Sequence, residues 1–290
     1  MPEIMNAMTV DVEDWFNATV LQCSGLVVGP TSAVERNTED LLGLFNEHDV
    51  KATWFFLGEV AETYPQLVKD VAAAGHEPGV HGYHHHQVAS MSRDSFREAV
   101  TRAKGAVESA GGVEVKGYRA VDFGREHRDG PILDDLFECG FVYDSSAFPF
   151  RGPRYGSGGT PLGPHRIDVQ GGQMLELPVT VGEILGVRLP AAGGGYFRLF
   201  PLWYTNMLFK LAHASGRAVI FYIHPCEIEA SSVLSDLPQS LTPSQRMCVK
   251  KLFKKQSKNR RLGRQKLKEI FARYSFGSIE EILLKDGVTE

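Results

Sequence analysis

The chain has 290 residues, of which 43% are apolar and 23% are charged, and these proportions exclude disordered and fibrous proteins. The length suits one large α/β domain. A formal net charge of -4 gives no general affinity for nucleic acid, so no nucleic-acid partner is expected. Residues 1–8 hold no basic stretch followed by an apolar one, and no run of about 18 apolar residues occurs, so we expect a cytoplasmic location.

Strand-like and helix-like segments alternate along most of the chain. The expected strands are 7–12, 52–57, 76–81, 115–119, 141–143, 174–181 and 218–223. The expected helices are one opened by Asn37 or Thr38, then 64–74, 92–107, 131–139 and 202–214. This alternation predicts a parallel sheet, either in a barrel or in an open doubly wound arrangement. In both folds, functional side chains gather at the carboxyl ends of the strands.

Cysteines and basic residues give two further expectations. The four cysteines, Cys23, Cys139, Cys226 and Cys248, are far apart and form no CxxC pair, so we expect free thiols. Residues 242–273 are rich in Lys and Arg, interrupted by apolar residues. We expect a catalytic domain over 1–240 and, over 241–290, a basic helical extension packed on the same domain. The alternative for this extension is peripheral contact with a membrane surface or an anionic glycan.

Histidines are concentrated in one short segment, His-Gly-Tyr-His-His-His at 81–86. In a helical turn, His81 and His85 would face the same way and could offer two imidazole nitrogens to one metal ion. A catalytic zinc-type centre needs a third protein ligand. The sequence Asp-Val-Glu-Asp at 11–14 follows the first strand and supplies both a carboxylate ligand and a free carboxylate that could accept a proton from water.

In this order, the motifs resemble the polysaccharide deacetylases of the NodB-homology family, carbohydrate esterase family 4. The resemblance covers most of residues 7–228. Its four motifs are the acids at 11–14, the histidines at 81–85, Arg119 in Gly-Tyr-Arg-Ala at 117–120, and His224 in Phe-Tyr-Ile-His-Pro at 221–225. Tyr-Asp-Ser-Ser at 143–146, Glu-Leu-Pro at 176–178 and Gly-Gly-Gly-Tyr-Phe-Arg at 193–198 further resemble the subgroup found with bacterial exopolysaccharide loci.

The resemblance implies a distorted (β/α) barrel and a role for each motif. Asp11 would be the catalytic base, His224 the general acid, and Arg119 the cation that keeps Asp11 ionised and oriented. His81 and His85 would hold the metal.

Three positions depart from the family pattern. The usual adjacent pair of aspartates is spread into Asp-Val-Glu-Asp, so the third metal ligand is Glu13 or Asp14. Glu13 is favoured because it would share the strand face of Asp11, and Asp14 because the acids are adjacent in the commoner motif. Gly82 replaces a Ser or Thr, and Val121 replaces a Pro.

The expected activity is metal-dependent removal of N-acetyl groups from an amino sugar, in a bacterial-type polysaccharide or its lipid-linked precursor, with release of acetate. Zn²⁺ is the expected ion, and Co²⁺ or Ni²⁺ would also suit a His/His/carboxylate set. Two alternatives stay open: a deacetylase or amidase of a small, non-polymeric amide, and a catalytically inactive glycan-binding homologue.

Overall fold

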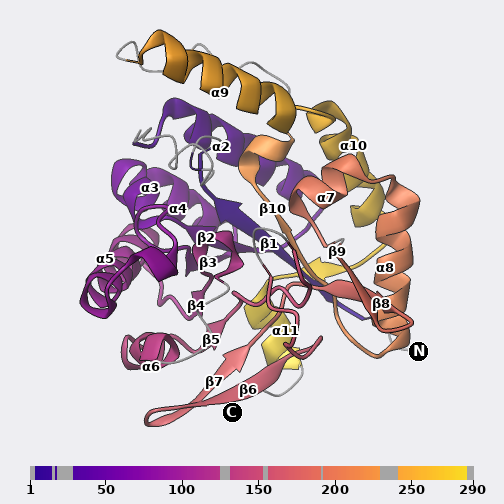
Figure 1. The fold of residues 1–290 in the computed structure, drawn as a ribbon, viewed down its shortest axis with the longest axis horizontal. Coiled ribbons are helices and arrows are strands. Elements are labelled where there is room, and N and C mark those ends of the chain that lie inside the picture. The colour runs from indigo at the N-terminus through magenta and orange to yellow at the C-terminus, as the bar shows by residue number, and fades with distance from the viewer. Residues whose placement is uncertain are drawn as a thin grey trace.

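The fold is a curled sheet with helices packed around its outer face (Figure 1). The structure is a computed structural model that describes residues 4–14, 17, 29–124, 131–152, 156–190, 192–228 and 241–285, without the side chains of 252, 255 and 256. Cys23 lies outside these ranges. The other three cysteines are free thiols, as predicted: Cys139, Cys226 and Cys248.

Seven parallel strands run through the sheet in the order β10-β1-β2-β3-β4-β5-β7, with β6 antiparallel at the edge. Their bounds are β1 Asn6–Val12, β2 Thr53–Phe56, β3 Glu77–Val80, β4 Gly117–Tyr118, β5 Tyr143–Asp144, β6 His165–Val169, β7 Gly172–Glu176 and β10 Ile220–Ile223. A separate hairpin joins β8, Val181–Ile184, to β9, Val187–Pro190. The strands β1, β2, β3 and β10 are buried at every residue, as expected for a parallel sheet covered on both faces.

Irregular segments link the two ends of the curled sheet. The Thr180 N–H donates to the Ile220 carbonyl at 3.1 Å, and the Ile220 N–H donates to Thr180 Oγ1 at 2.8 Å. Gly193 forms an isolated bridge with Tyr222 of β10. At Gly193, φ is +129° and a Cβ atom would lie 1.7 Å from the Tyr222 carbonyl oxygen, so only glycine fits there. The sheet is therefore an incompletely closed barrel, and the predicted distorted (β/α) barrel is confirmed.

Ten α-helices lie within the described ranges. Their bounds are α2 Ser32–Glu47, α3 Gly58–Thr63, α4 Pro65–Ala73, α5 Arg93–Gly111, α6 Pro131–Glu138, α7 Gly194–Leu199, α8 Leu202–Ala214, α9 Pro243–Gln256, α10 Arg260–Phe271 and α11 Ile279–Lys285. The helix predicted at 202–214 is confirmed. The expected start of α2 at Asn37 or Thr38 was wrong, because the Thr31 side chain accepts the Ala33 N–H and caps the helix earlier. Among the described residues, no helix is long and apolar enough to span a bilayer.

The end of the chain returns to the core of the sheet. Strand β11, Phe276–Gly277, pairs with the start of β1. The Ile279 N–H donates to Thr53 Oγ1 at 2.8 Å, and the Glu280 N–H donates to Glu77 Oε2 at 3.0 Å. The first residues of α11 are thus fixed to β2 and β3. The proposed boundary between residues 240 and 241 stays a prediction, but the segment after it supplies a strand to the main sheet.

His76 provides a test of this packing through acid sensitivity. Its ring is buried beside Trp54 and Phe45, and Nδ1 accepts the Ala52 N–H at 3.1 Å. Burial, with a smaller contribution from Lys51, lowers the pKa of His76 to about 4 from 6.5. Between these two values the unfolded chain binds the extra proton, so this contribution to stability is present near pH 7 and is lost as the pH falls.

We expect His76→Asn, which keeps an acceptor near the Nδ1 position, to reduce the acid sensitivity of folding. The wild-type free energy of unfolding should fall more than that of the variant between pH 7 and pH 5, by about 2 kcal/mol. Urea denaturation at both pH values measures this difference. Parallel losses in the two proteins would contradict the assignment.

Candidate active site and metal centre

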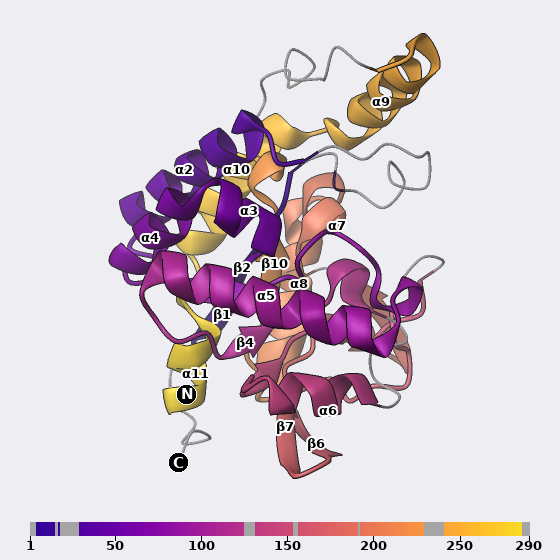
Figure 2. The same ribbon diagram turned by 90° about the vertical axis from the view of Figure 1, so that its left-hand side faces the viewer.

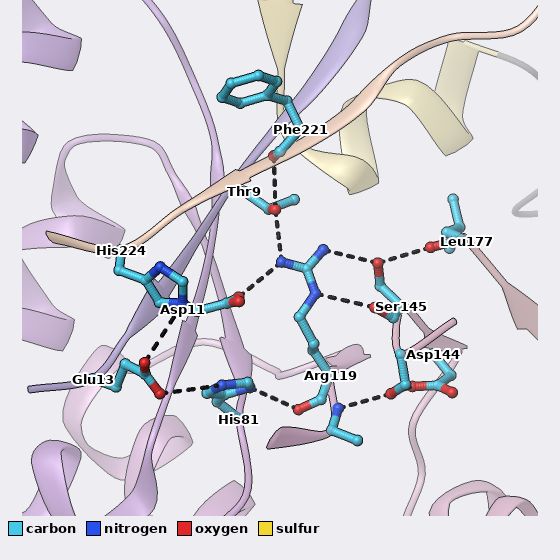
Figure 3. A network of polar contacts seen from close by, with 12 residues as sticks. Thr9, Asp11, Glu13, His81, Arg119, Asp144, Ser145, Leu177, Phe221 and His224 are labelled. Atoms are coloured by element: carbon cyan, nitrogen blue, oxygen red, sulfur yellow. Dashed lines mark hydrogen bonds and ion pairs between the residues drawn. The ribbon is translucent and has the colours of Figure 1, made fainter. Parts of the chain in front are cut away.

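The carboxyl ends of parallel strands bring the predicted site residues together (Figure 3). Asp11 lies near the end of β1 and Glu13 just after it, His81 follows β3, Arg119 follows β4, and His224 follows β10. Because β10, β1, β2, β3 and β4 are neighbours in the sheet, these side chains meet at one edge.

Arg119 is fully buried and its guanidinium is surrounded by acceptors. Nη1 donates to Asp11 Oδ1 at 2.8 Å and to Thr9 Oγ1 at 2.7 Å. Nε donates to the Ser145 carbonyl at 3.1 Å, and Nη2 donates to Ser145 Oγ at 2.9 Å. The guanidinium carbon also lies 4.4 Å from the centre of the Phe55 ring. A buried cation of this kind is stable only when paired and hydrogen-bonded, as it is here.

The surroundings of Asp11 favour its ionised form. Burial raises the pKa of Asp11, but the nearby Arg119, with His81 and His224, outweighs burial and brings the pKa below its ordinary value. The contact between Asp11 and Arg119 was expected from the sequence. The hydrogen bonds that Thr9 and Ser145 accept from Arg119 were not. Ser145 belongs to the Tyr-Asp-Ser-Ser motif at 143–146, a signal in the sequence to which no role had been given.

Glu13, His81 and His85 form a cluster in which one ligand atom of each residue lies within 4.8 Å of the others. Because a carbonyl can only accept, His81 Nδ1 carries the hydrogen and donates it to the Arg119 carbonyl at 2.9 Å. His81 Nε2 lies 3.8 Å from Glu13 Oε2. His85 Nε2 contacts the same Glu13 oxygen. Burial lowers the pKa of His81, which favours the neutral ring that a metal ion requires, whereas at His85 the contact with Glu13 outweighs burial and raises the pKa.

Asp14 points elsewhere. Its Oδ2 accepts the Thr31 hydroxyl at 2.6 Å and the Thr31 N–H at 2.9 Å, just before α2. Of the two acids that the sequence left open, the structure therefore brings Glu13, and not Asp14, to the two histidines.

The histidine segment is not helical, so the expected helical turn over 81–85 was wrong. The chain turns at Gly82 with φ +83°, a conformation that favours glycine, and this turn brings His85 back beside His81. Gly82 thus has a backbone reason for replacing Ser or Thr. His84 is half-exposed and its Nδ1 lies 2.7 Å from Glu59 Oε2, away from the cluster.

His224 lies beside the cluster and is partly exposed. Its Nε2 is 3.5 Å from Glu13 Oε1, and its Nδ1 is 3.3 Å from Glu227 Oε2. Burial lowers the pKa of His224, but Glu227, Glu13 and Asp11 together outweigh it and raise the pKa to about 9. The imidazole is therefore protonated near neutral pH and can act as an acid.

The backbone after Arg119 adopts an uncommon conformation. Asp122 and Phe123 both have positive φ, at 56° and 50°. Two consecutive non-glycine residues in this region cost on the order of 1–3 kcal/mol each, and such strain concentrates at functional sites. The strained turn begins at Val121, the position where the family pattern has Pro.

The donor set of the cluster fits a divalent transition metal. Two imidazole nitrogens and one carboxylate oxygen make up a ligand set found in catalytic zinc centres, and all three groups lie within reach of one ion. The hydrogen bond from His81 to a backbone carbonyl is the contact that fixes the ring orientation of a metal-ligating histidine.

Known families match both halves of the chain. Residues 28–124 match the family model described as polysaccharide deacetylase, and residues 145–284 match one described as a domain of unknown function, DUF3473. Curated relatives include a peptidoglycan-N-acetylglucosamine deacetylase of Bacillus cereus, 35% identical over 82 residues, which are 28% of this chain and 30% of the relative. A peptidoglycan deacetylase of Helicobacter pylori is 30% identical over 106 residues, or 37% of this chain and 35% of the relative.

The chain spans about a third of the length of these relatives. Among solved structures, one assigned as a polysaccharide deacetylase from Mycobacterium smegmatis has a TM-score of 0.60 at 22% identity, covering 97% of this chain and 90% of that one. This likeness supports the barrel fold. The family match over residues 28–124 and the ordered motifs make this part of the chain similar to polysaccharide deacetylases, and the solved structure shares its fold.

Proposed function

We propose that this domain is a metal-dependent hydrolase that removes N-acetyl groups from an amino sugar of a glycan and releases acetate. The observation that carries the proposal is geometric: Asp11 contacts the buried Arg119, and His224 contacts Glu227, both beside the cluster of Glu13, His81 and His85. The relatives named as deacetylases of peptidoglycan support an N-acetylated glycan as the substrate.

Glu13, His81 and His85 would hold the metal. When bound there, a divalent cation would polarise the acetamide carbonyl and make water more acidic. Asp11 takes the proton from the attacking water, because its contact with Arg119 keeps it ionised and fixed. His224 gives a proton to the departing amine of the sugar. The two side chains therefore divide the roles of base and acid.

The alternative of an inactive glycan-binding protein explains the cluster less well. Glycan binding needs neither a buried cation directed at an acid nor a second acid–base group beside it. A small amide as substrate stays open, and acetate release from chitin oligosaccharides, peptidoglycan and simple acetamides separates these substrate classes.

Asp11→Asn should reduce kcat by on the order of 100-fold or more, because Asn keeps the size of the side chain but cannot accept the proton. Folding and metal content should be retained. Acetate release, with thermal unfolding and metal analysis of the same sample, measures this. Asp168→Asn, which changes an exposed acid on β6, is the matched control. Near-normal turnover by Asp11→Asn would show that another group is the base.

His81→Ala should lose both the metal and activity, because Glu13 and His85 alone hold an ion weakly. His84→Ala changes a histidine of the same segment that pairs with Glu59 outside the cluster, so it should keep one metal per chain. Metal analysis after dialysis compares the two. Treatment of the wild type with a chelator should abolish activity, and Zn²⁺, Co²⁺ or Ni²⁺ should restore it. Equal metal content in both variants would show that His81 is not a metal ligand.

We further propose that the protein is cytoplasmic and meets a membrane-linked precursor through helix α9. Figure 2 shows α9 projecting from the body of the domain, and Lys250, Lys251 and Lys254 on it are exposed. Three of the cations of α10 are already engaged. Arg264 pairs with Asp40 at 2.7 Å, Lys268 lies 3.5 Å from Glu47, and Lys266 donates to three backbone carbonyls.

Reversal of two α9 charges, Lys250→Glu with Lys254→Glu, should weaken binding to phosphatidylserine vesicles by on the order of tenfold or more, since each basic residue near an anionic surface contributes about 1 kcal/mol. Lys69→Glu with Lys210→Glu makes the same charge change at exposed lysines on α4 and α8. Vesicle sedimentation at low and high salt compares the pairs. Equal binding by all proteins would make α9 an ordinary solvated helix.

A further inference from the structure

The turn after β10 holds a carboxylate against both the ring and the backbone of His224. Glu227 lies in the short 3₁₀ turn Pro225–Glu227. Its Oε2 is 3.3 Å from His224 Nδ1 and accepts the His224 N–H at 3.2 Å. One oxygen thus contacts the imidazole and the residue's own backbone, which restricts the side-chain rotation of His224 and leaves Nε2 facing Glu13.

A second contact fixes Glu227. Its other oxygen, Oε1, lies 3.8 Å from Nη1 of Arg198, and both side chains are at most 10% exposed. Arg198 belongs to α7. The carbonyls of Phe197 and Arg198 in α7, and of Phe200 just after it, accept hydrogen bonds from Lys266 of α10 at 3.0, 3.1 and 2.7 Å. The last turn of α7 is therefore tied to α10.

We infer that Glu227 is a positioning residue for His224, and that Arg198, held in place by α10, fixes Glu227 in turn. The inference rests on the proposed function of His224 as the general acid. A carboxylate at Nδ1 holds the proton there, so the proton that can be transferred lies on Nε2, toward the metal-type cluster. Glu227 contacts His224 only at Nδ1 and at the backbone, which places it outside the path of proton transfer.

This arrangement gives the basic C-terminal segment a part in the reaction. Lys266 would act through α7, Arg198 and Glu227 on His224, a chain of contacts from α10 to the site. A purely structural Glu227 would stabilise the turn and affect every substrate alike. A positioning Glu227 affects mainly the substrates whose leaving group needs a proton.

The experiment compares an amide with an activated ester. Chitin oligosaccharides leave a basic sugar amine, whereas 4-nitrophenyl acetate leaves an anion that needs no proton. Glu227→Ala should lower kcat for the oligosaccharide by on the order of tenfold or more, with little change in KM, and should leave ester turnover within about two- to threefold. Glu227→Gln keeps an acceptor for the His224 N–H. This variant should fold like the wild type and recover part of the kcat that Glu227→Ala loses.

Glu183→Gln is the control, because Glu183 is an exposed acid of β8 that contacts Arg188 across the hairpin. Metal content should be equal in all variants. A parallel fall for amide and ester would overturn the inference. Side-chain ¹⁵N NMR of His224 gives a readout that needs no turnover: a protonated, hydrogen-bonded Nδ1 is expected in the wild type and should be lost in Glu227→Ala. An unchanged Nδ1 signal would also overturn it, whereas an inactive wild type that shows the signal would count only against the proposed function.

Discussion

The buried guanidinium of Arg119 is the constraint on which the site depends. A cation without solvent contact needs acceptors in fixed positions, and Thr9, Asp11 and Ser145 supply them from β1 and the end of β5. Its backbone carbonyl also accepts the Nδ1–H of His81. Arg119 therefore orients Asp11 through its side chain and His81 through its main chain. The positions of Asp11 and of the cluster of Glu13, His81 and His85 are thus linked through one residue.

Opposite partners give Asp11 and His224 opposite properties. Asp11 faces a cation and keeps its pKa below the ordinary value despite burial, whereas His224 faces Glu227 and Glu13 and has its pKa raised to about 9. Each charge favours the form that its role requires. Near neutral pH these surroundings favour an ionised carboxylate at Asp11 and a protonated imidazole at His224. The proposed amide hydrolysis would need this combination, because water must lose a proton and the amine must gain one.

Sequence patterns predicted the strands and helices that depend on neighbouring residues. Features that depend on contacts between distant residues could not be predicted in this way. The apolar run of β1 and the bounds of α8 follow from periodicity, and the motif order led to Asp11, Arg119 and His224. The choice of Glu13 over Asp14 depends on Thr31, whose hydroxyl holds Asp14 before α2. Pairing of β11 with β1 joins segments about 270 residues apart and leaves no local signal.

The site is assembled from regions that sequence comparison treats separately. His81, His85 and Arg119 lie within the polysaccharide deacetylase match at 28–124, and His224 and Glu227 lie within the second match at 145–284. Asp11 and Glu13 precede both. A fragment limited to the first match would keep two imidazoles and the cation but would lack the carboxylates and the acid. Since the second region also supplies α7 and α10, the residues inferred to position His224 lie in the part of the chain that the deacetylase match does not cover.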